Sequence, residues 1–182
     1  RKNKSSLETI MLCQKSLMEN VGFQSVTEII TSLSGYHNLV KLDLNSNKLG
    51  IETSIAVGEL LKQPNMKIED LDLSSNHIDN ECIATLADGF AKSKTLKKLN
   101  LGGQERLVFG FGDRGIIVLA DVVANSATIK SVDLRDNRRI TPTGWCAFFN
   151  CLRNSATVVE ELNLGGNTID DEGAAGLADV FS

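Results

Sequence analysis

A short pattern of hydrophobic positions recurs along the chain and divides it into similar units. Its clearest copy combines Leu71, Leu73 and Ile78 with Asn76. The spacing repeats as Leu42, Leu44, Asn47, Leu49 and as Leu162, Leu164, Asn167, Ile169, with looser copies at Leu99, Leu101, Gln104 and at Val132, Leu134, Asn137, and a degenerate one at Ile10, Leu12, Lys15, Leu17.

The first hydrophobic residue of each unit defines a repeat of about 29 residues. Successive spacings are 32, 29, 28, 33 and 30 residues, and the last unit is cut short. Self-similarity at such a period is typical of solenoids. We therefore expect a single domain over residues 1–182 that is a fragment of a longer chain. Its six units start at Leu7, Leu39, Ile68, Leu96, Ile129 and Val159.

Each unit has two halves with different periods. In residues 69–74 the leucines alternate with polar residues, which predicts a short strand with one buried face. Residues 174–181 carry a hydrophobic stripe of helical period, and the other units repeat it. A glycine such as Gly115, Gly144 or Gly173 precedes several stripes, and we interpret it as the residue that opens the helix.

These units predict a right-handed α/β solenoid, because a strand and a helix of this length bury their hydrophobic faces only when copies stack. Helices are wider than strands, at roughly 10 Å against 4.8 Å. The stack should therefore curve into a horseshoe segment, with parallel strands on the concave face and helices on the convex face.

The polar residue that follows each strand is predicted to be structural. An inward amide there can satisfy buried backbone groups of its own unit and of the neighbouring unit. Gln104 is one methylene longer than asparagine, so its rung should be displaced. About five residues are inserted beside it, within 105–110. The amide ladder consists of Asn47, Asn76, Gln104, Asn137 and Asn167.

Composition excludes several classes of function. A net charge of −4 and a pI near 5.2 argue against a general nucleic-acid binder. No hydrophobic run approaches the roughly 18 residues of a membrane span. The four cysteines form no C-x-x-C pair, which favours a reducing compartment, and we predict a cytoplasmic location. With two histidines, no metal site is expected.

No motif supports catalysis, so we predict that the protein is not an enzyme and takes no cofactor or small-molecule substrate. Neither G-x-S-x-G nor H-E-x-x-H occurs. Residues 110–115 match G-x-G-x-x-G, but the repeat register already accounts for Gly115, and no dinucleotide-binding unit surrounds the match.

The full pattern, L-x-x-L-x-L-x-x-N-x-L, resembles the leucine-rich repeat. Units of 28–29 residues with a full helix are similar to the ribonuclease-inhibitor-like class, which includes the repeat domains of NOD-like receptors and of Ran GTPase-activating protein. The resemblance covers roughly residues 7–182. It implies the solenoid fold and is not specific for function, since the scaffold serves many partners.

The outward strand positions are the best candidates for binding another protein. Lysines and an arginine partly balance the acids there, and the concave face is mildly acidic. Our candidates are Lys41, Asp43, Asn45, Asp70, Asp72, Lys98, Asn100, Asp133, Arg135, Glu161 and Asn163. In the inserted loop, Glu105, Arg106 and Phe109 form a second candidate contact, although its hydrophobic residues could instead pack over the neighbouring helix.

Together these observations predict a non-catalytic protein-interaction module whose rigid concave surface steers basic partners. One alternative is a GTPase regulator resembling Ran GTPase-activating protein. Its site would lie on loops at one edge of the horseshoe. The arginines to test there are Arg106, Arg114, Arg138 and Arg139. Another alternative is ligand sensing in an NOD-like receptor.

Overall fold

Six strands form a single parallel sheet in the order of the chain. The computed structural model describes residues 6–12, 23–104 and 110–180. Neighbouring strands pair in register, so that Leu71 lies between Leu42 and Leu99. The strands are β1 (Thr9–Met11), β2 (Lys41–Asp43), β3 (Asp70–Asp72), β4 (Lys98–Asn100), β5 (Ser131–Asp133) and β6 (Glu161–Asn163).

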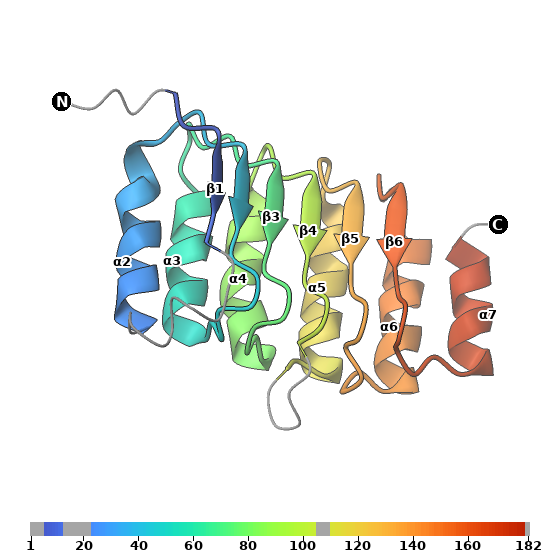
Figure 1. Ribbon diagram of the computed structural model, residues 1–182. Helices are drawn as coiled ribbons and strands as arrows, with labels where there is room; N and C mark the ends of the chain where they lie inside the picture. Colours follow the sequence, from blue (N-terminus) through green and yellow to red (C-terminus); the bar gives the residue numbers. More distant parts are fainter. Residues whose placement is uncertain (1–5, 13–22, 105–109, 181–182) are drawn as a thin grey trace.

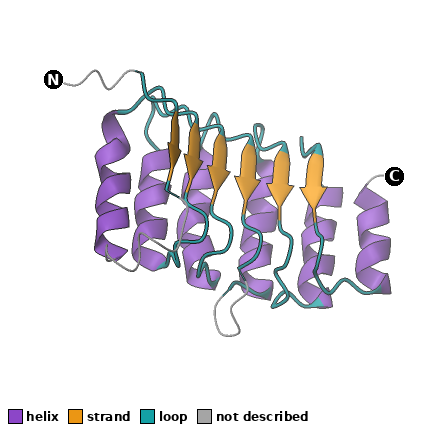
Figure 2. Cartoon of the chain, viewed as in Figure 1, coloured by secondary structure: helices purple, strands orange, loops and turns teal. Residues whose placement is uncertain are grey.

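A row of helices covers one face of this sheet (Figure 1). Strands and helices alternate along the chain, which gives two layers (Figure 2). The row of helices extends further than the row of strands, so the stack curves with the strands inside. The α/β solenoid predicted from the repeat is confirmed. Its helices are α2 (Phe23–Ser32), α3 (Ile51–Leu61), α4 (Asn80–Lys92), α5 (Asp113–Asn125), α6 (Pro142–Arg153) and α7 (Asp171–Val180), with a 3-10 turn η1 (Leu33–Gly35) after α2.

Each strand from β2 to β6 has three residues, and three residues after its end the backbone turns through a left-handed residue. This residue directly precedes the ladder amide and is serine, glycine or aspartate. A positive φ is costly for residues other than glycine, so the same turn in five units is specified by the fold. The φ values are 59° at Ser46, 54° at Ser75, 65° at Gly103, 54° at Asp136 and 74° at Gly166.

The hydrophobic core lies between the sheet and the helices. The inward leucines of the central strands, Leu42, Leu71 and Leu99, are at most 1% exposed. Towards the C-terminal end the core becomes aromatic. Trp145 stacks on Phe149 with ring centroids 5.9 Å apart. Hydrophobic burial along the whole stack therefore fixes the strand positions from which polar side chains project.

The glycines that we interpreted as opening the helices are the third residue of each helix. Their role is close packing. A Cβ at Gly115 would lie 2.7 Å from Phe111 Cβ, and one at Gly173 would lie 2.9 Å from Ile169 Cγ2. The helix start therefore lies two residues earlier than this interpretation placed it.

Candidate functional site: the concave face and the amide ladder

The amide ladder joins successive units through their backbones. Asn76 Oδ1 accepts hydrogen bonds from the backbone N–H groups of Asn47 at 2.9 Å and Leu49 at 3.0 Å. Asn76 Nδ2 donates to the carbonyls of Leu44 at 3.0 Å and Leu73 at 2.9 Å. Asn76 is 2% exposed. Its amide therefore satisfies buried groups in two units, and it contacts no solvent-facing partner.

Gln104 occupies its rung in a different way. Its Oε1 accepts the backbone N–H of Ile78 at 3.2 Å, and its Nε2 donates to the Leu73 carbonyl at 2.8 Å. Both partners belong to the preceding unit and are equivalent to the Leu49 N–H and the Leu44 carbonyl that Asn76 binds. In the described part of the chain, Gln104 shows no hydrogen bond to its own unit like the one from Asn76 to Leu73. On the next rung, Asn137 Nδ2 donates to the carbonyls of Leu101 and Leu134. Its buried Oδ1 has no hydrogen-bond partner among the described residues.

The outward strand side chains form rows across the concave face. The pairing register places Lys41, Asp70 and Lys98 in one row. This row is extended by Ser131 and Glu161. The second row, which we call the middle row, runs along the strand ends and consists of Met11, Asp43, Asp72, Asn100, Asp133 and Asn163. All eleven candidate residues of the face lie in these two rows or, for Asn45 and Arg135, directly beyond them.

Side chains of the middle row are fixed by hydrogen bonds to their own chain. Asp72 Oδ1 accepts the backbone N–H of Ser74 at 2.8 Å and the Ser74 hydroxyl at 2.6 Å. Asp133 accepts the backbone N–H of Arg135 at 3.0 Å. Asp43, Asn100 and Asn163 accept the backbone N–H two residues later in the same way. Each of these oxygens therefore closes an Asx turn at the end of its strand.

Two of these carboxylates also bind the amide of the next strand. Asp72 Oδ2 accepts from Asn100 Nδ2 at 2.9 Å, and Asp133 Oδ2 accepts from Asn163 Nδ2 at 2.9 Å. Asp43 is only 7% exposed, and its Oδ1 accepts hydrogen bonds from the backbone N–H and from the side-chain amide of Asn45. Much of the acidity predicted for this face is thus held in a hydrogen-bond network along the middle row.

The exposed side chains of the face are therefore few. Met11 is 60% exposed at one end, Lys98 is exposed near the middle, and Arg135, Glu161 and Asn163 are exposed towards the other end. Lys41 forms an ion pair with Asp70 at 2.9 Å. This bond is the main cause that raises the pKa of Lys41.

The inserted-loop candidates Glu105, Arg106 and Phe109 lie outside the described residues. Three arginines among the described residues lie at the edge of the solenoid beyond the strand ends. Arg139 donates to the Gly110 carbonyl at 3.1 Å, and Arg138 lies 3.5 Å from the Asp136 carboxylate. Arg114, exposed on the first turn of α5, is the third.

The G-x-G-x-x-G segment does not form an open anion site. The backbone N–H groups of Gly112 and Gly115 both donate to Asn80 Oδ1, at 2.9 Å each. Asn80 is the first residue of α4, so a side chain from the preceding helix caps the N-terminus of α5. Asp113 does the same for the next helix, since its carboxylate accepts from the Thr141 N–H at 2.8 Å. Sequence reasoning missed these caps, although Asn80 and Asp113 occupy equivalent positions in consecutive units.

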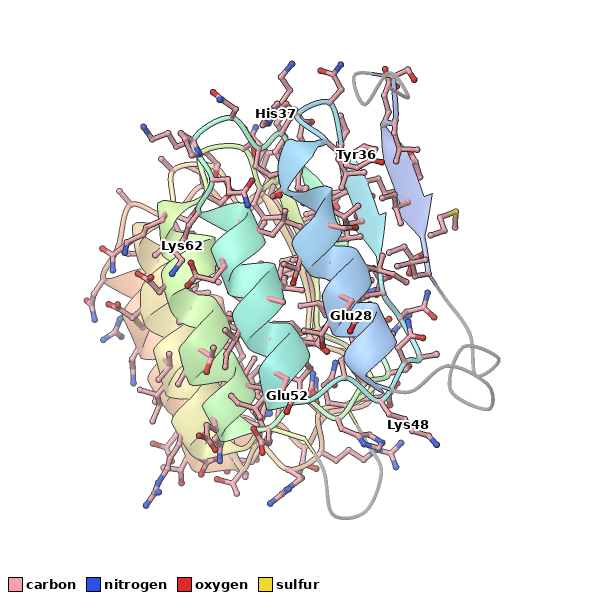
Figure 3. All side chains as sticks on the ribbon, turned by 90° about the vertical axis from the view of Figure 1, so that its left-hand side faces the viewer. Glu28, Tyr36, His37, Lys48, Glu52 and Lys62 are labelled. Atoms are coloured by element: carbon pink, nitrogen blue, oxygen red, sulfur yellow. The ribbon has the colours of Figure 1, made fainter. Side chains whose placement is uncertain are left out.

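The edge of the solenoid where the helices begin carries a hollow of about 520 Å³ between α3 and α4. Cys82 lines it, and burial raises the pKa of this thiol. Figure 3 shows Lys48 and Glu52 at this edge, opposite His37 and Tyr36 at the edge where the strands begin. Within residues 6–12, 23–104 and 110–180, no three His, Cys, Asp or Glu side chains are grouped to hold a metal ion.

Comparison with known proteins identifies the repeat. A family model described as "Leucine Rich repeat" matches residues 65–87, 125–145 and 155–178. Human "NACHT, LRR and PYD domains-containing protein 3" is 25% identical over 85% of the chain, and the ribonuclease inhibitor of Sus scrofa is 27% identical over 80%. The chain spans 14% and 30% of the lengths of these two relatives.

A solved structure agrees with the fold. Actin-binding site 2 of leiomodin-1 superposes with a TM-score of 0.67 and 15% identity, covering 88% of this chain and 90% of that one. At this identity the similarity concerns the fold alone. In the described part of the chain, no helix is long and hydrophobic enough to cross a membrane.

Proposed function

Because the chain is a leucine-rich repeat protein of the ribonuclease-inhibitor-like class, we propose that it is a non-catalytic protein-interaction module whose concave face contacts the partner. The relative named ribonuclease inhibitor takes its name from acting on another protein. In this chain the partner contacts would come from the exposed side chains around the middle row.

One observation carries this proposal: the middle row is rigid before any partner binds. Asp72 is fixed by three hydrogen bonds, to the backbone N–H and hydroxyl of Ser74 and to the amide of Asn100. Association normally costs about 0.5–1.5 kcal/mol for each flexible side chain that becomes ordered. The bonded side chains of the middle row avoid this cost and hold the strand ends in place, so only the exposed side chains around them would have to become ordered on binding.

The bonding also defines which substitutions test the face fairly. Replacing Asp43, Asp72 or Asp133 by lysine would remove a strand-end hydrogen bond. A loss of partner binding could then come from a loss of stability. We therefore choose Met11→Lys, Arg135→Glu and Glu161→Lys, because these side chains are exposed and do not close a strand-end turn. Within the described part of the chain, the one ion pair among them is the exposed contact of Arg135 with Asp133 at 3.8 Å. A control on the helices, Ile117→Lys, Arg114→Glu and Glu28→Lys, makes the same charge changes.

The experiment compares proteins captured by the immobilised parent chain and by both variants from extracts of the cells that express it, quantified by mass spectrometry. We expect a defined set of proteins to fall at least about fivefold with the face variant and to persist with the helix variant, as loss of an exposed hot spot predicts. If the face variant recovers every protein that the parent enriches, or if only the helix variant loses them, the concave face is not the contact surface.

A further inference from the structure

Five exposed lysines gather where β3, β4 and β5 begin, although the chain carries a net negative charge. This edge lies at the opposite end of the strands from the ladder turns and is the upper edge in Figure 1. We call this surface the lysine rim. It consists of Lys67, Lys94, Lys97, Lys98 and Lys130.

Backbone hydrogen bonds hold these lysines on adjacent segments. The N–H of Lys130 donates to the Lys97 carbonyl at 2.8 Å, and Ser131 donates to the same carbonyl at 3.0 Å. The Thr95 hydroxyl donates to the Ile68 carbonyl at 2.9 Å, which places the segment around Lys94 beside the segment that carries Lys67. Neighbouring strands lie about 4.8 Å apart, so the positive charges are closely spaced.

Carboxylates compensate this charge only in part. Lys97 pairs with Glu69 at 2.8 Å and Lys130 pairs with Glu160 at 2.6 Å. Both lysine side chains are 50% exposed, and exposed pairs of this kind are weak. Among the described residues, no carboxylate lies within ion-pair distance of the other three lysines. Five positive charges are thus balanced by only two glutamates in direct contact. The lysines are exposed and do not belong to the hydrophobic core.

The chemistry of the rim selects among negatively charged partners. Lysine ammonium groups are mobile point charges, which suit carboxylates in an extended segment and do not need a fixed bidentate geometry. The rim segments 66–70, 94–98 and 126–131 contain no aromatic residue on which bases could stack. Asp70 and Glu161 lie beside the rim in the adjoining strand row, so a long continuous polyanion would meet repulsion at its flanks.

We propose that the lysine rim binds an acidic polypeptide segment of the partner. This inference rests on the proposed interaction function and adds a second contact to it: the rim takes a run of Asp and Glu residues while the concave face takes the folded body of the partner. Opposite charge at the rim would raise the association rate and set the orientation of the partner.

The test uses a fluorescein-labelled peptide with four consecutive glutamates between glycines and the purified chain, measured by fluorescence anisotropy at low ionic strength. Lys94→Glu combined with Lys98→Glu should weaken binding about tenfold, because two attractive charges become repulsive. The matched control, Lys48→Glu with Arg114→Glu, makes the same charge change on the opposite edge and should weaken binding less than about twofold. Raising the NaCl concentration should weaken the parent complex, since salt screens exposed charges.

Equal weakening by both double variants, or no weakening by the rim variant, would overturn the proposal. Tighter, rim-dependent binding of an oligothymidine or of phosphatidylserine vesicles would overturn the assignment to a polypeptide. The two proposals fail separately. If the peptide does not bind but the face variant still loses captured proteins, only the rim proposal falls. If the peptide binds the rim and the face variant captures every protein that the parent chain captures, only the concave-face proposal falls.

Discussion

Asn100 donates a hydrogen bond from its side-chain amide to the Asp72 carboxylate, 2.9 Å away on the neighbouring strand. At the same time Asn100 Oδ1 accepts the backbone N–H of Gly102 at 3.0 Å. An aspartate at 100 could keep the second bond and would lose the first. The amide at position 100 therefore separates the carboxylates of Asp72 and Asp133, its neighbours in the middle row.

We predict that Asn100→Asp lowers the free energy of unfolding by about 1–2 kcal/mol at pH 7, through a lost hydrogen bond and like-charge cross-strand pairs with Asp72 and Asp133. The loss should shrink near pH 4, where a carboxylate begins to protonate. The exchange variant, Asp72→Asn with Asn100→Asp, should restore stability. Urea unfolding at both pH values tests this. An exchange variant no more stable than Asn100→Asp would show that the pair does not determine the loss.

The buried rung at Asn76 should matter more than the last rung. Asn76→Ala is expected to cost about 3 kcal/mol, because it leaves the N–H groups of Asn47 and Leu49 buried and unpaired. Asn167 is only partly buried, so Asn167→Ala should cost about 1 kcal/mol. Urea unfolding of the two variants compares them. Equal losses would mean that burial does not set the strength of a rung.

The left-handed turn before the ladder offers a stabilising change. Ser75 has φ 54° and its side chain is exposed, so Ser75→Gly should raise the free energy of unfolding by about 0.5 kcal/mol. In the next unit, Gly103→Ala should lower it by about 1 kcal/mol, since Gly103 has φ 65° and a new Cβ would lie 3.1 Å from Ser75 Oγ. Thermal unfolding followed by circular dichroism measures both. The same sign for the two changes would contradict the turn assignment.

Burial of the Cys82 thiol predicts a pH dependence of stability. The folded pKa is raised, chiefly by desolvation, so the unfolded state loses its thiol proton first as pH rises. Stability should therefore be intact below the unfolded thiol pKa of about 8.5 and should fall by at most about 2 kcal/mol by pH 10. Comparing the urea midpoint with that of Cys82→Ala at pH 7 and pH 10 isolates this effect. An identical fall in the variant would assign the pH dependence to other groups.

Sequence reasoning located the strands and the ladder because both depend on local periods. Leu71 and Leu73 alternate with polar residues, and only the hydrophobic side can enter the core. Gln104 bonds the Ile78 N–H and the Leu73 carbonyl, which are equivalent to the Leu49 N–H and Leu44 carbonyl bonded by Asn76. The displacement expected for the Gln104 rung therefore stays a prediction.

The candidate site was harder to predict, because pleat alternation gives the side of a residue and not its bonds. Asp43 was expected to be available to a partner, yet it is nearly buried and bonded to Asn45. The Asx bond depends on where the strand turns, which the hydrophobic period does not report. The lysine rim draws lysines from three separate units, so no single stretch of sequence displays it.

The amide ladder also makes the contacts between successive units unequal in stability. Among the described residues, Asn76 makes three hydrogen bonds to the preceding unit, Gln104 and Asn167 make two each, and Asn47 and Asn137 make one each. A solenoid transmits stability only between neighbouring units. In the part of the chain that the structure describes, the seam between the fourth and fifth units therefore has fewer ladder hydrogen bonds than the seam on either side of it. Hydrogen exchange should therefore show two cooperative blocks, the units before this seam and the units after it. The contact between the blocks should open at a lower free energy than either block unfolds.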